Sequence, residues 1–153
     1  MPTEEIKNYL YVDERIITGG QPTSEQLREL AALGHGAVIN LGLLDPKYCL
    51  ADEAGLVAAL GMQYRHIPIL FDAPATQDFR DFLRAMDDLA DQRVFVHCAA
   101  NYRVSSCMAI YAEKRLGWSR ERADQHACRL WEPNDVWRAF VRDCRALFLC
   151  PNL

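Results

Sequence analysis

The chain has 153 residues, of which 50% are hydrophobic, and a formal net charge of -4 at pH 7. This length suits one domain with a substantial core, so we expect residues 1–153 to form a single domain. The acidic balance argues against nucleic-acid or membrane-surface binding through a basic field. No apolar run approaches the roughly 20 residues that cross a bilayer, and the N-terminus lacks signal-peptide features, so a cytoplasmic location is expected.

Strands and helices alternate through the first part of the chain. Four apolar runs predict strands, over residues 9–12, 16–18, 37–41 and 62–70. The breaker Gly19-Gly20-Gln21-Pro22 precedes a helix that begins near Thr23 or Ser24, because Thr23 and Gln26 have the spacing of a capping box. A shorter helix is expected over 52–60.

The second part of the chain is expected to be mostly helical. A helix over 76–91 packs on one side, and a strand over 93–97 follows it. Three more helices are predicted over 104–116, 120–130 and 133–147. Gly117 suits the end of the first, Ser119 the cap of the second and Pro133 the first turn of the third. Together these elements predict an α/β domain with a mainly parallel central sheet flanked by helices.

The cysteine and histidine spacings predict no metal site. The cysteines are scattered through apolar patterns, so we expect free thiols in a reducing compartment. The chain has no Cys-x-x-Cys pair, and its four histidines lack close ligand spacing. We therefore expect neither a metal nor a cofactor.

The segment from Val94 to Ser105 carries the strongest functional signal. A short apolar strand delivers His97 and Cys98 into a tight turn that leads through Arg103 into a helix. Such a turn directs successive backbone N–H groups and a helix N-terminus at one point, which favours a thiolate or a bound phosphate. Cys98 is therefore a candidate nucleophile. The alternative is a small buried residue at the end of a strand.

Three neighbours of Cys98 fit the same chemistry. Arg103 offers two parallel N–H donors to a phosphate, a planar match that lysine lacks. Ser105 offers its hydroxyl to the thiolate sulfur. His97 is expected to orient the loop by hydrogen bonding, or else to be a satisfied core histidine at the end of the strand.

The run from His97 to Ser105 resembles the phosphate-binding loop of cysteine-dependent protein tyrosine and dual-specificity phosphatases. Three upstream segments resemble a bacterial subgroup of these phosphatase-like domains, with relatives fused to β-lactamase-fold hydrolases: Ile17-Thr18-Gly19-Gly20-Gln21-Pro22-Thr23, Val38-Ile39-Asn40-Leu41 and Tyr64-Arg65-His66-Ile67-Pro68-Ile69. The resemblance extends from about Tyr9 to Leu116. It implies a twisted sheet surrounded by helices, with the loop at the carboxyl end of a central strand.

The resemblance also implies which residues form the pocket. Gln21 is expected in its wall, and the loop itself supplies the other substrate-binding residues: His97, Ala99, Ala100, Asn101, Tyr102 and Val104. In the family an aspartate from a preceding loop protonates the leaving oxygen. Asp72 is the candidate here, with Asp45 in a poorer position. Asp72 also suits a solvated turn beside Pro74.

The loop departs from the family pattern in its spacing. Four residues separate Cys98 from Arg103, one fewer than in the family, and Val104 separates Arg103 from Ser105. Without a gap, Val104 takes the arginine position and Arg103 is rotated by about 100° around the helix, away from the phosphate. Alternatively, the loop is one residue tighter and Arg103 still reaches inward. Asn101 replaces the usual glycine, and asparagine tolerates a positive φ.

These features predict a cysteine-dependent phosphatase that hydrolyses phosphate monoesters of proteins or small molecules. Cys98 would form a phosphocysteine, Arg103 and the loop N–H groups would hold the phosphoryl oxygens, Ser105 would stabilise the departing thiolate and Asp72 would act as acid and then base. Two alternatives remain open. One is a rhodanese-like sulfurtransferase with a persulfide on Cys98, because its loop has a similar length. The other is a catalytically silent anion-binding pseudophosphatase, because Val104 stands at the arginine position.

Overall fold

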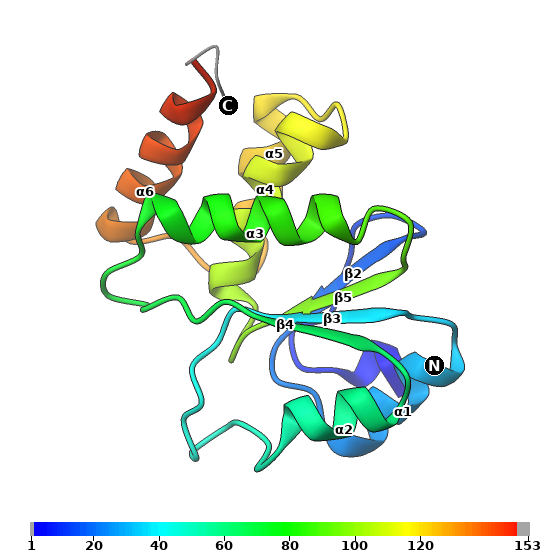
Figure 1. The fold of residues 1–153 in the computed structure, drawn as a ribbon. Helices are drawn as coiled ribbons and strands as arrows, with labels where there is room; N and C mark the ends of the chain where they lie inside the picture. The colour runs from blue at the N-terminus through cyan, green and yellow to red at the C-terminus, as the bar shows by residue number, and fades with distance from the viewer. Residues whose placement is uncertain (1, 150–153) are drawn as a thin grey trace.

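The computed structural model describes residues 2–149, and its centre is a five-stranded sheet in the order β1-β2-β5-β3-β4 (Figure 1). The strands are β1 (Leu10–Tyr11), β2 (Ile16–Gly19), β3 (Ala37–Asn40), β4 (Gln63–His66) and β5 (Val94–His97). Only β1 is antiparallel to its neighbour β2, and the other pairs are parallel. The predicted α/β architecture with a mainly parallel sheet is therefore confirmed.

Helices cover both faces of this sheet. The α-helices are α1 (Ser24–Ala32), α2 (Glu53–Ala59), α3 (Thr76–Asp88), α4 (Tyr102–Arg115), α5 (Arg120–Ala127) and α6 (Asp135–Ala146), with 3-10 turns η1 (Pro2–Glu5) and η2 (Leu147–Leu149). Helices α1 and α2 lie on one face, and α3 to α6 on the other (Figure 1). Within residues 2–149, no helix combines the length and apolarity that a membrane span requires.

The strands supply a core to each face. Alternate side chains of a strand point to opposite sides of a sheet. Accordingly, Val94 and Val96 pack into the core beneath α3, α4 and α6, whereas Phe95 between them packs into the core beneath α1 and α2. All three are fully buried. Strand β5 is therefore held from both sides, which fixes the position of the loop that follows it.

Most helix ends follow their capping residues. The capping box of Thr23 and Gln26 is present, and Ser119 accepts a hydrogen bond from the backbone N–H of Arg122. Gly117 follows the end of α4 with a φ of 73°. The predicted position of Pro133 in the first turn of the last helix is wrong. The cap is Asn134, whose side chain accepts a hydrogen bond from the N–H of Trp137 and so starts the helix after the proline.

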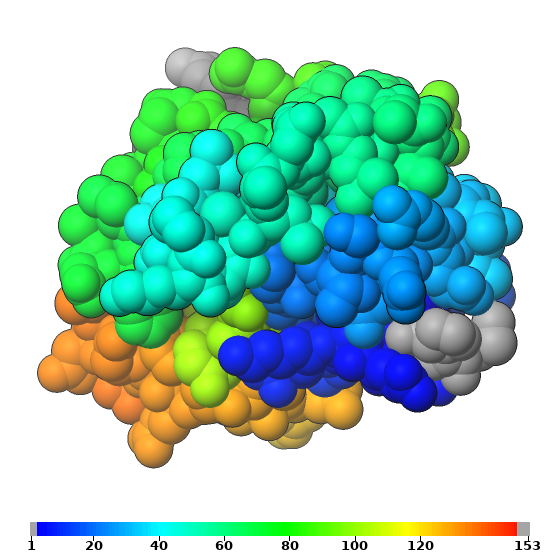
Figure 2. Space-filling model, turned by 90° about the horizontal axis from the view of Figure 1, so that it is seen from below, coloured from blue at the N-terminus to red at the C-terminus, as the bar shows by residue number. Residues whose placement is uncertain are grey.

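The carboxyl ends of the parallel strands meet at one edge of the sheet. Gly19 and Asn40 are both register partners of His97, so β2, β3 and β5 end together. Seen from below, the yellow-green segment near residue 100 emerges among the dark blue N-terminal segment, the cyan loop after β3 and the orange segment near residue 130 (Figure 2). The loop that begins with Cys98 lies at this edge.

Candidate active site

The turn after β5 is fixed by an asparagine in the left-handed conformation. Asn101 has a φ of 68°, as expected for a residue that replaces glycine. Its Nδ2 donates to the backbone oxygen of Asn8 at 2.8 Å and to Oγ1 of Thr18 at 3.0 Å. Asn101 is also the N-cap of α4, but its side chain makes no capping hydrogen bond. The N–H groups at the start of α4 therefore remain available to another acceptor.

Three successive carbonyl groups of the loop are held by the surrounding protein. The oxygen of Cys98 accepts from Nδ1 of His97 at 3.2 Å, and that of Ala99 from the N–H of Gln21 at 3.0 Å. The oxygen of Ala100 accepts from Nδ2 of Asn8 at 2.8 Å. In a trans peptide the C=O and N–H groups point in opposite directions. The N–H groups of residues 99–101 are therefore directed away from these donors.

The loop thus presents a row of backbone donors. Among residues 2–149, no protein group accepts a hydrogen bond from the N–H groups of residues 99–104. These groups belong to the turn and to the first positions of α4, where the helix dipole also favours negative charge. Cys98 lies at the start of this row and is only 1% exposed. Such a row of free backbone donors is suited to an anion.

Arg103 contacts the loop that carries Asp72. Its side chain is buried, its Nη1 donates to the backbone oxygen of Ile69 at 2.9 Å, and its guanidinium carbon lies 5.9 Å from the centre of the Phe71 ring. Within the described chain, only the Ile69 oxygen accepts a hydrogen bond from this guanidinium. The Nε and Nη2 donors remain available for a fork-like contact with an oxyanion. Val104, in contrast, is fully buried in the apolar core.

Asp72 lies on a loop that is anchored at two residues just before it. Arg103 holds the Ile69 oxygen, and Nε1 of Trp137 donates to the backbone oxygen of Phe71 at 2.8 Å. The Asp72 side chain itself is exposed. The two anchors restrict the loop while leaving this carboxylate accessible to solvent.

The other predicted loop residues have partners of their own. The Ser105 hydroxyl donates to the backbone oxygen of Tyr102 at 3.1 Å. The Tyr102 ring stacks on Trp131, with centres 4.8 Å apart and planes 5° apart. Trp131 also contacts Phe71, with ring centres 5.5 Å apart. Aromatic packing therefore connects the cysteine loop with the loop of Asp72.

A buried carboxylate that the sequence analysis did not single out lies behind the cysteine loop. Oε2 of Glu53 is 2.7 Å from Nε2 of His97, and the two side chains are 2% and 0% exposed. Oε1 of Glu53 accepts from Nε2 of Gln21 at 2.7 Å. Burial raises the pKa of Glu53, but hydrogen bonds from His97, Gln21 and Tyr64 and the charge of His97 outweigh it, so the net shift is downward. The only feature of the sequence that could have indicated this burial is the spacing of Glu53 from Val57, which places both on one face of α2.

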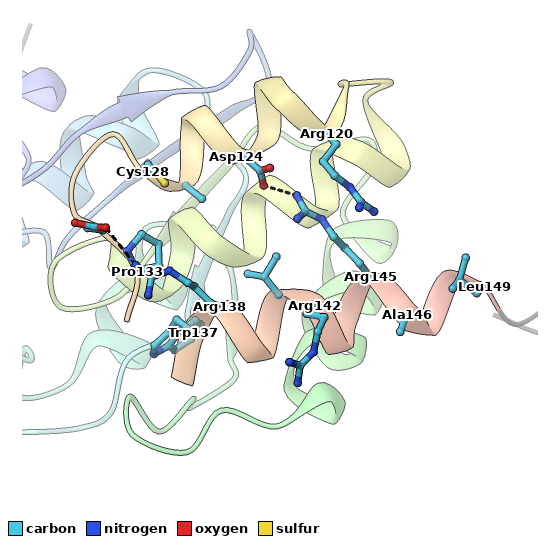
Figure 3. A pocket seen from close by; sticks show the side chains of 13 residues that line it. Arg120, Asp124, Cys128, Pro133, Trp137, Arg138, Arg142, Arg145, Ala146 and Leu149 are labelled. Carbon is cyan, nitrogen blue, oxygen red and sulfur yellow. Dashed lines mark hydrogen bonds and ion pairs between the residues drawn. The ribbon is translucent and has the colours of Figure 1, made fainter. Parts of the chain in front are cut away.

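A separate groove of about 580 Å³ lies between α5 and α6 (Figure 3). Its described lining comes from residues 120–149, so it is distinct from the cysteine loop. Arg145 points toward Asp124, with an N–O distance of 2.7 Å, and Arg138 pairs with Glu132 at 3.2 Å. The arginines of the groove are paired with carboxylates of the same chain, so the groove has little unpaired positive charge with which to attract an anion.

A parallel sheet with a cysteine and a row of free backbone donors at its carboxyl edge is the arrangement expected of cysteine-dependent phosphatases. A family model described as DSP-PTPase phosphatase fused to NAD+ kinase matches residues 3–133. The chain therefore belongs to this dual-specificity phosphatase family. No curated protein matches the sequence.

Solved structures agree with this assignment. The DUF442 protein of Shewanella putrefaciens CN-32 is 27% identical, with a TM-score of 0.85 and coverage of 95% of both chains. The active form of Tk-PTP is 18% identical, with a TM-score of 0.78 and coverage of 91% of this chain and 97% of that one. PTPMT1 in complex with PI(5)P is 16% identical, with a TM-score of 0.73 and coverage of 93% and 99%. At the two lower identities the similarity concerns the fold.

Proposed function

We propose that this chain hydrolyses phosphate monoesters through a phosphocysteine formed on Cys98, with a phosphoprotein or a small phosphoester as substrate. The observation that carries the proposal is the row of backbone N–H groups over residues 99–104, which have no protein acceptor within residues 2–149. A phosphoryl group carries its charge on several oxygens, and such preorganised donors stabilise that charge as it develops. Membership of a phosphatase family supports the same chemistry.

The first step is the transfer of the phosphoryl group to sulfur. The thiolate of Cys98 attacks phosphorus, the bond from phosphorus to the ester oxygen breaks, and Asp72 donates a proton to that oxygen. The Nε and Nη2 groups of Arg103 bind the phosphoryl oxygens while its Nη1 keeps the contact with Ile69. Arg103 thereby brings the Asp72 loop close to the bound phosphate.

The second step regenerates the enzyme. Water attacks phosphorus, the phosphorus–sulfur bond breaks, and Asp72, now ionised, accepts the proton of that water. The products are inorganic phosphate and the thiolate of Cys98. Ser105 assists the departure of the thiolate by rotating its hydroxyl from the oxygen of Tyr102 toward the sulfur.

The direct test is turnover of p-nitrophenyl phosphate by the wild type and by Cys98→Ser. We expect phosphate release by the wild type, its loss in Cys98→Ser, and a covalent phosphoryl group on the Cys98 peptide after rapid acid quenching. Wild-type protein that binds inorganic phosphate but shows no turnover and no covalent adduct would contradict the proposal and leave the silent binding module.

The role of Asp72 has its own test. Loss of a general acid slows substrates with poor leaving groups more than substrates with good ones. Asp72→Asn should therefore lower kcat for a phenyl phosphate more than for p-nitrophenyl phosphate. Asp45→Asn is the matched control, because Asp45 is the other loop aspartate of the sequence analysis. Equal effects of the two variants on kcat would show that Asp72 is not the general acid.

The sulfurtransferase alternative gives a different product on the same residue. Incubation with thiosulfate followed by mass spectrometry should show no persulfide on Cys98. A persulfide that transfers to cyanide, in a protein without phosphatase turnover, would favour that reading instead.

A further inference from the structure

Glu53 is a deeply buried carboxylate that takes no part in the chemistry proposed above. Three donors face it: Nε2 of Gln21, Nε2 of His97 and the hydroxyl of Tyr64. The Tyr64 oxygen already accepts from Nδ2 of Asn40 at 3.0 Å, so its own hydrogen is directed to Glu53. A carboxylate that receives several donors is favoured in its ionised form.

Two of these contacts continue directly into the cysteine loop. His97 holds the oxygen of Cys98 through Nδ1, and Gln21 holds the oxygen of Ala99 through its backbone N–H. One oxygen of Glu53 binds each of these two residues. Through these two residues, the carboxylate restrains the peptide groups that follow Cys98 and Ala99.

The contacts of His97 determine where its protons lie. A carbonyl oxygen only accepts, so Nδ1 carries the hydrogen that it shares with Cys98. At Nε2 the partner is Glu53, 2.7 Å away. The ring is therefore held between the Cys98 oxygen and the Glu53 carboxylate. Both side chains of the pair are buried, so water does not compete for the contact between them.

We infer that Glu53 is a positioning residue of this site, which acts through His97 and Gln21 to direct the loop N–H groups at the Cys98 thiolate and at a bound anion. The inference rests on the proposed function only for its consequence in catalysis. Its structural content, the orientation of the loop and the ionisation of Cys98, is measurable without turnover.

Ionisable groups beside Glu53 and on the Cys98 side of the sheet keep one charge state at neutral pH. Burial raises the pKa of Tyr64 to about 12 and raises that of Cys107, so both stay neutral. Arg103 stays cationic.

The experiment compares Glu53→Gln with Asp52→Asn. Asp52 caps the same helix through the N–H of Gly55, is exposed and does not contact His97, so its variant controls for disturbance of α2. The readout is thiolate absorbance near 240 nm across a pH titration, after subtraction of the same variant carrying Cys98→Ser. We expect Glu53→Gln to raise the titration midpoint by about one pH unit and to weaken inorganic phosphate binding at least tenfold, and Asp52→Asn to change neither.

A double variant separates positioning from general support of the fold. If Glu53 acts through His97, Glu53→Gln should add little to the midpoint shift of His97→Gln. If Glu53→Gln does not fold, Tyr64→Phe removes one donor to the carboxylate without removing its charge, and a smaller upward shift is expected. An unchanged midpoint and unchanged phosphate affinity in a folded variant would overturn the inference. Absence of turnover in the wild type, with these shifts present, would overturn only the proposed function.

Discussion

Replacement of Asn101 tests how the turn of the cysteine loop is stabilised. Two effects are combined at this residue: a left-handed backbone with a φ of 68°, and an Nδ2 group bonded to Asn8 and Thr18. Asn101→Gly removes both hydrogen bonds and keeps an easy left-handed turn. Asn101→Ala removes the same bonds and adds a methyl group that disfavours that turn. The two variants therefore separate the backbone effect from the side-chain effect.

The expected magnitudes follow from these contacts. Two hydrogen bonds at about 0.5 to 1.5 kcal/mol each predict that Asn101→Gly lowers the free energy of unfolding by about 1 to 3 kcal/mol. The left-handed conformation costs a residue with a Cβ a further 1 to 2 kcal/mol or so. Glycine loses roughly 0.5 to 1 kcal/mol through its flexible unfolded chain. Asn101→Ala should thus be less stable than Asn101→Gly by about 1 kcal/mol.

Urea unfolding of the wild type and both variants measures these differences, with the slope of the transition as a check on two-state behaviour. Thr18→Val removes one of the two acceptors and is the matched control. Its cost and that of Asn101→Gly should be less than additive in the double variant, because they share a hydrogen bond. Equal stability of the alanine and glycine variants would refute the backbone argument. Full additivity would refute the contact with Thr18.

Three further variants test the loop, the anchor of the Asp72 loop and a buried histidine of α5. In Gly20→Ala the new Cβ would lie 2.6 Å from the oxygen of Ala99, so the loop must shift, and calorimetric titration should show at least tenfold weaker phosphate binding. Trp137→Phe removes the donor to the Phe71 oxygen and should lower kcat most for substrates with poor leaving groups. An equal loss of kcat for good and poor leaving groups would show that this contact does not support proton transfer. Burial lowers the pKa of His126 to about 4 from 6.5. Between these pH values the unfolded chain binds a proton that the folded protein does not, so the free energy of unfolding should fall by up to about 3 kcal/mol from pH 6.5 to pH 4. His126→Gln should reduce this dependence of the free energy of unfolding on pH, as measured by urea unfolding.

The elements that the sequence predicted well are those with local causes. The capping box of Thr23 and Gln26 and the cap at Ser119 depend on residues three positions apart, so their geometry can be read from a short window. The positive φ at Asn101 follows equally from a turn that must reverse between a strand and a helix. Pro133 was misplaced because asparagine at the next position competed for the start of α6 and won through its side-chain hydrogen bond.

The parts of the site that were missed depend on contacts between distant segments. Glu53 meets His97 only because β3 brings α2 to the carboxyl edge of the sheet, and the sequence near Glu53 resembles any helix start. The contact of Arg103 with Ile69 likewise depends on the path of the loop after β4. Neither the burial of a carboxylate nor the acceptor of an arginine is specified by neighbouring residues.

The short spacing between Cys98 and Arg103 coexists with a full row of backbone donors. The donors of residues 99–104 belong to the backbone, so they persist whichever side chains follow. Helical geometry then places neighbouring side chains about 100° apart: Val104 enters the apolar core, and Arg103 turns toward Ile69 and the Asp72 loop. Val104 is therefore part of the core, and Arg103 stays the candidate for contact with an anion. The guanidinium of Arg103 thus contacts the proposed general-acid loop, while its Nε and Nη2 groups have no protein acceptor among residues 2–149.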